Sequence, residues 1–345
     1  MFKEQFPLLT NTTYLNTAYV GLMSIPLADF RRSHEEAYLL NGGDHYKIQA
    51  YKDLDKMHQN FALFFGSTAD RCFGISNFSS GIRVALSLLP KRMNVLLIEE
   101  DYPSLSNAFK EFDFNVETIP MGSNLEELIE EKLKSTSVAI LALSIVQYTT
   151  GLLIDQDFLK RMKIEYPNLL ILGDGTQFLG AHQFHFDRSP FDVVAASGYK
   201  WLLAGFGNGI VLFSKAFKER TAQSTVQISD RFFQGHFNIL GMASLNFAIH
   251  QFIKNDFQAL VEFKSKLSQK AKMQLNELGF LPSWVLERTN HSSIFNIDGG
   301  ENLFHFLLKK KIRVVQRGAG IRISFHFYNT EEDLNSLVKA LKEFK

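Results

Sequence analysis

Three short apolar segments between Leu169 and Ser214 constrain the fold of this chain more than any other part of its sequence. They are Leu169–Leu172, Asp192–Ala196 and Ile210–Phe213, and each adjoins a polar loop that contains glycine. Apolar runs of this length, bounded by turn residues, predict buried strands. Helical segments alternate with such strands along the chain, which favours a largely parallel sheet with helices on both faces. The predicted fold class is therefore α/β.

Polar side chains stand where the first two of these strands end. Asp174 and Gln177 follow one strand, and Ser197 and Lys200 follow the next. Because open α/β sheets bind ligands beyond the carboxyl ends of their strands, we expect these four side chains to converge on one crevice. A lysine that ends an apolar strand beside Trp201 is poorly placed to improve solubility. It is well placed for chemistry, because desolvation lowers the pKa of an amine and frees its lone pair.

The pattern Asp174-x-x-Gln177, then Ser197-x-x-Lys200 and a glycine-rich turn, resembles the cofactor site of class V (fold type I) enzymes that use pyridoxal 5′-phosphate (PLP). This family includes aminotransferases, cysteine desulfurases, kynureninases and proteins similar to isopenicillin-N epimerase. The resemblance implies that Lys200 forms a Schiff base with the cofactor aldehyde and that Asp174 keeps the pyridine nitrogen protonated. It also implies that Gln177 binds the phenolic oxygen and Ser197 the phosphate.

Taken one at a time, these residues have structural interpretations. Asp174 and Ser197 each precede a glycine and are typical of turns. A single lysine such as Lys200 is usually a solvated charge. The order and spacing of the whole set, with 200 − 174 = 26 residues from Asp174 to Lys200, match the family pattern and favour the cofactor site.

The resemblance extends to a helix start that follows the strand beginning at Cys72. A helix N-terminus favours anions, because its free N–H groups and the helix dipole both point at them. The family places the cofactor phosphate at this turn, which assigns phosphate binding to the Phe78 backbone and Ser79, with Ser80 as a further candidate. Capping of the helix by one of these serines is the structural alternative.

Two tyrosines follow the next predicted strands. Tyr102, after the strand Met93–Glu99, stands where the family has a ring that stacks on the cofactor pyridine. Core packing is its alternative. Tyr148 follows the strand Val138–Ser144, and the resemblance places it near the cofactor oxygen or the substrate. Desulfurases usually carry asparagine at the position of Tyr148, so this residue points away from them.

The substrate side of the predicted site rests on residues near the two ends of the sequence. Arg322, within the predicted strand Ile321–Phe327, resembles the family arginine whose bidentate fork binds the substrate α-carboxylate. Asn16 is a weaker candidate, with a turn as its alternative. Arg317 precedes Arg322 in a loop, and we expect it to be solvated.

The segment that contains Gln234, Gly235 and His236 stands where the family has a motif that reaches across a dimer interface to the neighbour's phosphate. The resemblance therefore implies a homodimer with the active site at its interface. His236 replaces the usual threonine, and a packed surface histidine is the alternative.

The resemblance also implies the overall organisation. We expect a mainly parallel seven-stranded sheet with helices on both faces in a large PLP-binding domain of residues 17–254. A small α+β domain of residues 255–345, completed by residues 1–16, follows it. The predicted helices include 27–41, 49–65 and a long segment from Ile239 to Leu278 that breaks near Asn255.

Charge and cysteine content restrict the possible partners. The 37 basic and 36 acidic residues give a net charge of +1, and this balance predicts no nucleic-acid or membrane partner. No metal site is predicted either. Cys72 is the single cysteine, which excludes an internal disulfide and fits a reducing cytoplasm.

We predict an aminotransferase that acts on a small-molecule amino acid or related amine through Lys200. A PLP-dependent lyase or epimerase, kynureninase-like or isopenicillin-N epimerase-like, is the alternative, and Tyr102-Pro103-Ser104 supports it. A PLP-binding protein without catalysis is a further alternative. The short interval from Arg317 to Arg322 has no cysteine, so we do not expect the persulfide route of cysteine desulfurases.

Overall fold

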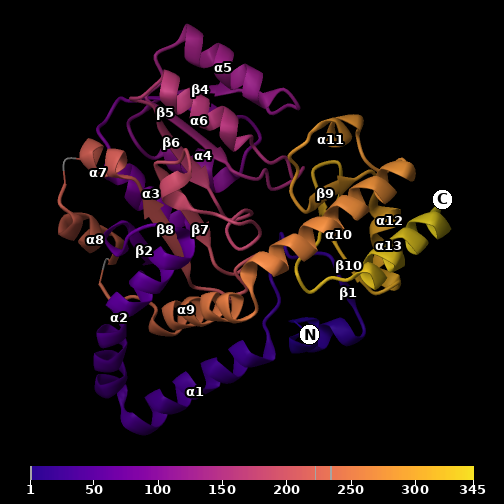
Figure 1. Ribbon diagram of the computed structural model, residues 1–345, viewed down its shortest axis with the longest axis horizontal. Helices are drawn as coiled ribbons and strands as arrows, with labels where there is room; N and C mark the ends of the chain where they lie inside the picture. The colour runs from indigo at the N-terminus through magenta and orange to yellow at the C-terminus, as the bar shows by residue number, and fades with distance from the viewer. Residues whose placement is uncertain (1, 222, 234) are drawn as a thin grey trace.

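A seven-stranded sheet forms the centre of the molecule (Figure 1), as seen in a computed structural model that describes residues 2–221, 223–233 and 235–345. The strand order is β2-β8-β7-β6-β5-β3-β4. β8 runs antiparallel to both of its neighbours, and the other pairs are parallel. The predicted mainly parallel sheet is therefore confirmed. Its strands are β2 (Cys72–Ile75), β3 (Asn94–Ile98), β4 (Asn115–Ile119), β5 (Ile140–Ser144), β6 (Leu170–Asp174), β7 (Val193–Ser197) and β8 (Gly209–Phe213).

Helices cover both faces of this sheet, because successive side chains of each strand point to opposite faces. In β3, Val95 and Leu97 pack into one apolar cluster with α3, α4, α7 and α8, whereas Leu96 and Ile98 pack into another with α2, α5, α6 and α9. The covering helices are α2 (Gly43–Phe65), α3 (Phe78–Ser87), α4 (Pro103–Lys110), α5 (Leu125–Ser135), α6 (Gln156–Glu165), α7 (Lys215–Thr221), α8 (Thr225–Phe233) and α9 (Ile239–Lys254).

The helix α1 (Ile25–Asn41) packs beside α2 and α9 at the lower edge of the view in Figure 1. Its start is fixed locally, because the Ser24 side chain accepts a hydrogen bond from the Leu27 N–H and Pro26 stands in the first turn. Leu39 and Leu40 near its end are 82% and 80% exposed.

The C-terminal residues build a second, smaller core beside the sheet (Figure 1). A three-stranded antiparallel sheet of order β11-β12-β9 lies in it, and β1 pairs with β10 in parallel. This pairing brings the N-terminal segment onto the C-terminal part and supports the proposed division into residues 17–254 and residues 255–345 with 1–16. The elements are β1 (Thr13–Tyr14), α10 (Phe257–Glu277), α11 (Ser283–Glu287), β9 (Ile294–Ile297), α12 (Glu301–Lys309), β10 (Ile312–Arg313), β11 (Val315–Arg317), β12 (Gly320–Ser324) and α13 (Glu331–Phe344).

Four short 3₁₀ helices complete the structure: η1 (Phe2–Gln5), η2 (Pro7–Thr10), η3 (Ala69–Arg71) and η4 (Phe186–Arg188). The helix break that the sequence predicts near Asn255 is confirmed. Asp256 separates α9 from α10 and accepts a hydrogen bond from the Ala259 N–H. Thr330 and Asp333 form a capping box at the start of α13. Among the described residues, none of the helices has both the length and the apolar character needed to cross a membrane.

Candidate active site

The ends of β6 and β7 carry the residues around which the candidate site is built. Asp174 is the last residue of β6, Ser197 is the last residue of β7, and Lys200 follows three positions later. The side chains are buried, with Asp174 4% and Lys200 7% exposed. Because the two strands run parallel, their carboxyl ends meet at one edge of the sheet.

Lys200 faces a cavity of about 450 Å³ whose wall joins both parts of the chain. The contributing segments are the one that follows β1, the strand ends of the central sheet, and the hairpin β11–β12. The cavity is lined by Ala18, Tyr19, Val20, Tyr102, Pro103, Tyr148, Tyr199, Lys200, Phe206, Arg317 and Arg322. The charged groups in this lining are all cations, so the cavity suits an anionic ligand.

The amine of Lys200 is prepared for nucleophilic attack by its surroundings. Its Nζ lies 5.7 Å from the ring centroids of both Tyr102 and Tyr199. Burial lowers the pKa of Lys200 to about 8, although the nearby Asp174 carboxylate opposes this shift. A larger fraction of neutral amine is therefore present near pH 7 than for a solvated lysine.

Asp174 supplies a buried negative charge next to this lysine. Its Oδ1 accepts a hydrogen bond of 2.8 Å from the Thr176 N–H. Burial raises the pKa of Asp174 to about 6, against the effects of the Thr176 hydrogen bonds and the Lys200 charge. The group is thus ionised at neutral pH, where it suits a cationic ring nitrogen.

The turn between β2 and α3 is tied to the end of β7. The Phe78 N–H donates to Ser197 Oγ at 2.9 Å, and the Ser79 hydroxyl lies within hydrogen-bond distance of the Ser104 hydroxyl. Asn77 caps the helix, because its Oδ1 accepts from the Ser80 N–H at 2.9 Å. The structural alternative, capping of this helix by Ser79 or Ser80, is therefore wrong, because Asn77 is the N-cap residue.

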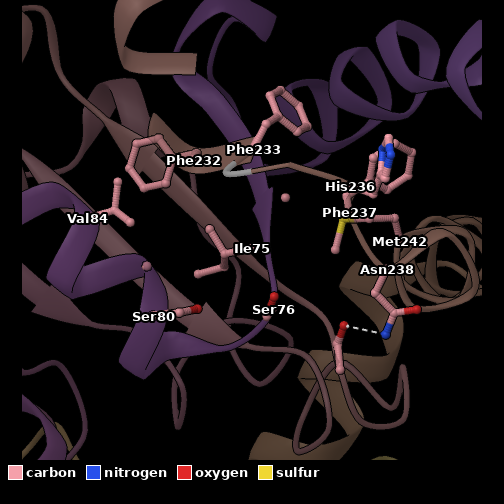
Figure 2. Close-up of a pocket in the computed structure, with 13 residues that line it drawn as sticks. Ile75, Ser76, Ser80, Val84, Phe232, Phe233, His236, Phe237, Asn238 and Met242 are labelled. Atoms are coloured by element: carbon pink, nitrogen blue, oxygen red, sulfur yellow. Dashed lines mark hydrogen bonds between the residues drawn. The ribbon is translucent and has the colours of Figure 1, made fainter. Parts of the chain in front are cut away.

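A second cavity, of about 200 Å³, borders this turn. Figure 2 shows Ser76, Ser80, His236 and Asn238 in its lining. Ser80 and His236 are thus not in the lining of the Lys200 cavity. The His236 ring lies 2.9 Å from the Tyr51 hydroxyl.

Gly235, which precedes His236, lines neither cavity. Gly235 has a φ of 101°, and a Cβ built there would meet nothing within 4 Å. Gln234, which the sequence places in the same motif, lies outside the described residues.

Gln177 is buried and bonded on both sides of its amide. Its Nε2 donates to the Ala18 carbonyl at 2.8 Å, and its Oε1 accepts from Trp201 Nε1 at 2.7 Å. The side chain therefore links the N-terminal segment to the residue that follows Lys200.

Arg322 reaches the cavity from β12. Its Nη1 donates to the Tyr148 carbonyl at 2.6 Å, and its Nε is buried without a hydrogen-bond partner. Burial lowers the pKa of Arg322 to about 10, and the charge of Arg317 adds to this shift. An arginine held by one nitrogen with another unpaired is suited to bind a carboxylate.

Asn16 lies beside this arginine strand. It forms an isolated bridge with Ser324, and its Oδ1 is buried without a partner. Asn16 is not in the lining of the Lys200 cavity. The structure thus brings it near the substrate side without placing it in the wall.

Four cavity residues, Tyr19, Tyr199, Phe206 and Arg317, were missed or misjudged in the sequence. Arg317, expected to be solvated, lies in β11 and lines the cavity, where its guanidinium is 5.3 Å from the Tyr19 ring centroid. Tyr199 stacks on Phe206 with ring centroids 4.9 Å apart. The position of Tyr199 next to Lys200 was the one available signal, since the other residues come from separate segments of the chain.

Cys72 is removed from this chemistry. It lies in β2 opposite Leu212 of β8 and is fully buried. Burial raises the pKa of its thiol well above the ordinary range. A buried, protonated thiol that does not line the cavity cannot accept sulfur there.

Comparison with known proteins agrees with this geometry. The family model described as "Aminotransferase class-V" matches residues 31–337. A probable cysteine desulfurase of Ureaplasma parvum serovar 3 is 21% identical over 400 aligned positions, which cover all of this chain and 97% of the relative. This relative conflicts with the expectation that separated the chain from cysteine desulfurases.

Solved structures show the same fold. A mutant of C-DES, with glycine covalently linked to the PLP cofactor, has a TM-score of 0.86 at 17% identity and 99% coverage of both chains. The cystine C–S lyase C-DES in complex with its product cysteine persulfide has a TM-score of 0.82 at 16% identity, with 98% of this chain and 99% of that one covered. A cysteine desulfurase of Thermococcus onnurineus NA1 has a TM-score of 0.81 at 16% identity, with 99% and 96% covered.

The residues present fit the family cofactor. A buried lysine with a lowered pKa, a buried carboxylate and a helix N-terminus meet at one edge of the sheet. The family match extends over most of the chain and includes all of these residues. The chain therefore belongs to the class V aminotransferase family of fold type I, and its cofactor is PLP.

Proposed function

We propose that this enzyme is a PLP-dependent C–S lyase, which eliminates a sulfur leaving group from the β-carbon of a cysteine-derived amino acid. One observation carries the proposal. The cavity combines Lys200 with Arg322 and has no cysteine in its lining, while the chain's single cysteine is buried in β2. Sulfur must therefore leave with a small-molecule product rather than on an enzyme thiol.

The residues that would hold the cofactor are those at the strand ends. Lys200 provides the covalent link, Asp174 pairs with the pyridine nitrogen, and Tyr102 stacks on the ring. The phosphate is assigned to the turn of Phe78 and Ser79 together with Ser197. Ser80 is a further candidate for this role. Gln177 and Tyr148 are assigned to the cofactor oxygen. When bound, PLP withdraws electrons from the substrate Cα and makes its proton acidic.

Lys200 then acts as the proton carrier. With a pKa of about 8, its amine is available in both protonation states near neutral pH. It accepts the proton from the substrate Cα and returns a proton to the sulfur that leaves. Asp174 would supply the negative charge that pairs with the protonated pyridine nitrogen.

The arginines select the substrate. Arg322 orients the α-carboxylate, Asn16 is bridged to Ser324 of the same strand, and Arg317 adds a second guanidinium in the cavity wall. Two arginines and no acid in the lining favour an amino acid with two carboxylates. Cystine has this chemistry, and its cleavage needs no enzyme thiol, because cystine and water yield cysteine persulfide, pyruvate and ammonia.

Transamination, the main prediction from the sequence, uses the same lysine and carboxylate. The named relatives support its lyase alternative better, since they are cysteine desulfurases and a cystine C–S lyase. The products separate the two reactions. A transaminase retains the substrate side chain in its keto acid and releases no ammonia.

The test measures products from the PLP-loaded enzyme supplied with cystine. We expect pyruvate, ammonia and cyanide-reactive sulfur in equal amounts, and no products from the Lys200→Ala control. A keto acid that retains the disulfide, without ammonia, would establish transamination instead. Recovery of D-cystine alone would establish the epimerase alternative.

We also propose a homodimer, in which Gly235 and His236 approach the neighbour's cofactor phosphate. The exposed Leu39 and Leu40 of α1 support an apolar contact between chains. Light scattering should give twice the 39.4 kDa mass of one chain. A mass of 39.4 kDa at micromolar concentration would contradict the dimer.

A further inference from the structure

Lys264 is a buried cation with no acidic partner. It lies in α10, is 1% exposed, and donates from Nζ to Ser293 Oγ at 2.9 Å. The ion pairs formed among the described residues do not include it. A buried charge held by a single hydroxyl is costly, so its retention needs another reason.

The second contact of Lys264 is with Trp201, the residue after Lys200. Its Nζ lies 5.5 Å from the indole centroid. Trp201 is itself 1% exposed, which removes water from this contact and strengthens the attraction between the cation and the ring.

Trp201 is connected to the candidate active site in two further ways. Its Nε1 donates to Gln177 Oε1 at 2.7 Å. Its carbonyl lies 3.1 Å from His326 Nε2, and the His326 ring stacks on the indole at a centroid distance of 5.4 Å. Lys264 and His326 both belong to the C-terminal part of the chain. They hold a residue whose neighbours are the cofactor lysine and the cofactor-binding amide.

The charges that face Lys264 are few. His182, in the loop after β6, and His326, after β12, are the titratable groups that interact with it. Burial lowers the pKa of His326 to about 3 and that of His182 well below the ordinary value, so both rings are neutral near pH 7. Burial also lowers the pKa of Lys264 to about 7. Lys264 is therefore the group of this cluster that changes charge near neutral pH.

We propose that Lys264 is a positioning residue of the active site, acting on Lys200 and Gln177 through the Trp201 indole. The protonated amine of Lys264 attracts the Trp201 indole and fixes its position, whereas the neutral amine does not. The proposal depends on Lys200 being the cofactor lysine and is independent of whether the reaction is C–S cleavage.

Tryptophan fluorescence tests the contact without the cofactor. The chain has two tryptophans, so a Trp284→Phe background leaves Trp201 as the reporter. In the cofactor-free full chain, we expect one transition of the emission between pH 6 and 8.5. Lys264→Met should abolish it, Lys264→Arg should fix the emission at its acid value, and Lys200→Ala should leave the transition in place. A transition that disappears only in Lys200→Ala, or no transition in the Trp284→Phe chain, would overturn the proposal.

The PLP-loaded enzyme tests the consequence for catalysis. We expect Lys264→Met to lower kcat about tenfold with KM within about twofold. In wild type, kcat should change near pH 7 as Lys264 titrates, and Lys264→Met should remove this neutral-pH limb of the kcat profile. Lys266→Met, at an exposed position on the same helix, is the matched control and should leave both unchanged. If Lys264→Met fails to fold by circular dichroism, Lys264→Arg supplies the comparison, because it should lose the neutral-pH limb while retaining kcat within about threefold. An unchanged pH profile in the folded variants would contradict the positioning role.

Discussion

The hydroxyl of Ser197 accepts a hydrogen bond of 2.9 Å from the backbone N–H of Phe78. These residues are 119 positions apart in the sequence, and the bond joins the end of β7 to the first residue of α3. Two segments assigned to the cofactor phosphate are therefore fixed to one another before any ligand is bound. This preorganisation lowers the cost of ordering the site when PLP binds.

Removing that hydrogen bond should weaken cofactor binding. We expect Ser197→Ala to raise the Kd for PLP about fivefold, since a hydrogen bond of this kind contributes on the order of 1 kcal/mol. Fluorescence titration of the cofactor-free protein measures it. Ser87→Ala, at an exposed position of α3, is the control and should leave the Kd unchanged. Equal affinities for the two variants would remove Ser197 from the phosphate site.

Asp174 should reduce the stability of the cofactor-free chain at neutral pH. Burial raises its pKa to about 6, so the folded state retains the proton more strongly than the unfolded state. Proton binding by Asp174 therefore stabilises the folded state. This contribution is fully present below the pKa of the unfolded state, near 4, and is lost as the pH rises through the folded-state pKa of about 6. In urea unfolding at pH 8, the free energy of unfolding of Asp174→Asn should therefore be about 1–3 kcal/mol higher than that of wild type. At pH 5 the difference should be smaller.

The control for that measurement is Asp70→Asn, an exposed substitution that should not alter the difference between pH 5 and pH 8. Asp174→Asn should at the same time lose catalysis, because the amide cannot keep the ring nitrogen protonated. A destabilised Asp174→Asn chain at pH 8 would refute the stated effect of burial on this carboxylate.

Cys72 should be dispensable for activity. It is fully buried in β2, and its thiol does not line the cavity. We expect Cys72→Ala to keep kcat/KM within about twofold while the free energy of unfolding falls by about 1 kcal/mol for the lost packing. Urea unfolding and the pyruvate assay measure the two effects. Loss of sulfur release in a folded variant would return this cysteine to the mechanism.

Arg317 should determine which substrates bind well. We expect Arg317→Met to raise KM for cystine about tenfold and to leave KM for S-methylcysteine, which has one carboxylate, within about twofold. Arg322→Met should raise KM for both substrates, because each has an α-carboxylate. If Arg317→Met affects the two substrates equally, the second-carboxylate assignment is wrong.

The strands that carry the site were predictable, and the edge of the sheet was not. Leu169–Leu172 and Asp192–Ala196 correspond to β6 and β7 within two residues, because burial on both faces makes such strands uniformly apolar. β4 escaped prediction because four of its five residues are exposed at the edge of the sheet. The predicted strand Ile321–Phe327 ends at Ser324 in the structure.

The site was predictable only where its residues follow strands in a fixed order. Asp174 and Lys200 are of this kind. Tyr19, Phe206 and Arg317 come from separate segments, and tertiary folding alone brings them to one wall. The N-cap role of Asn77 was predictable from the sequence. Asparagine is a preferred N-cap residue, and its side chain accepts from the N–H three positions later, here that of Ser80.

The most direct measurement of the central claim is peptide mass mapping after the PLP-loaded enzyme is reduced with borohydride. We expect a single phosphopyridoxyl group on Lys200 and an unmodified Lys264. The label should be absent from Lys200→Ala and present on Lys200 in the Lys264→Met variant. A label on another lysine, or no label after saturation with PLP, would contradict the assignment of Lys200 as the cofactor lysine.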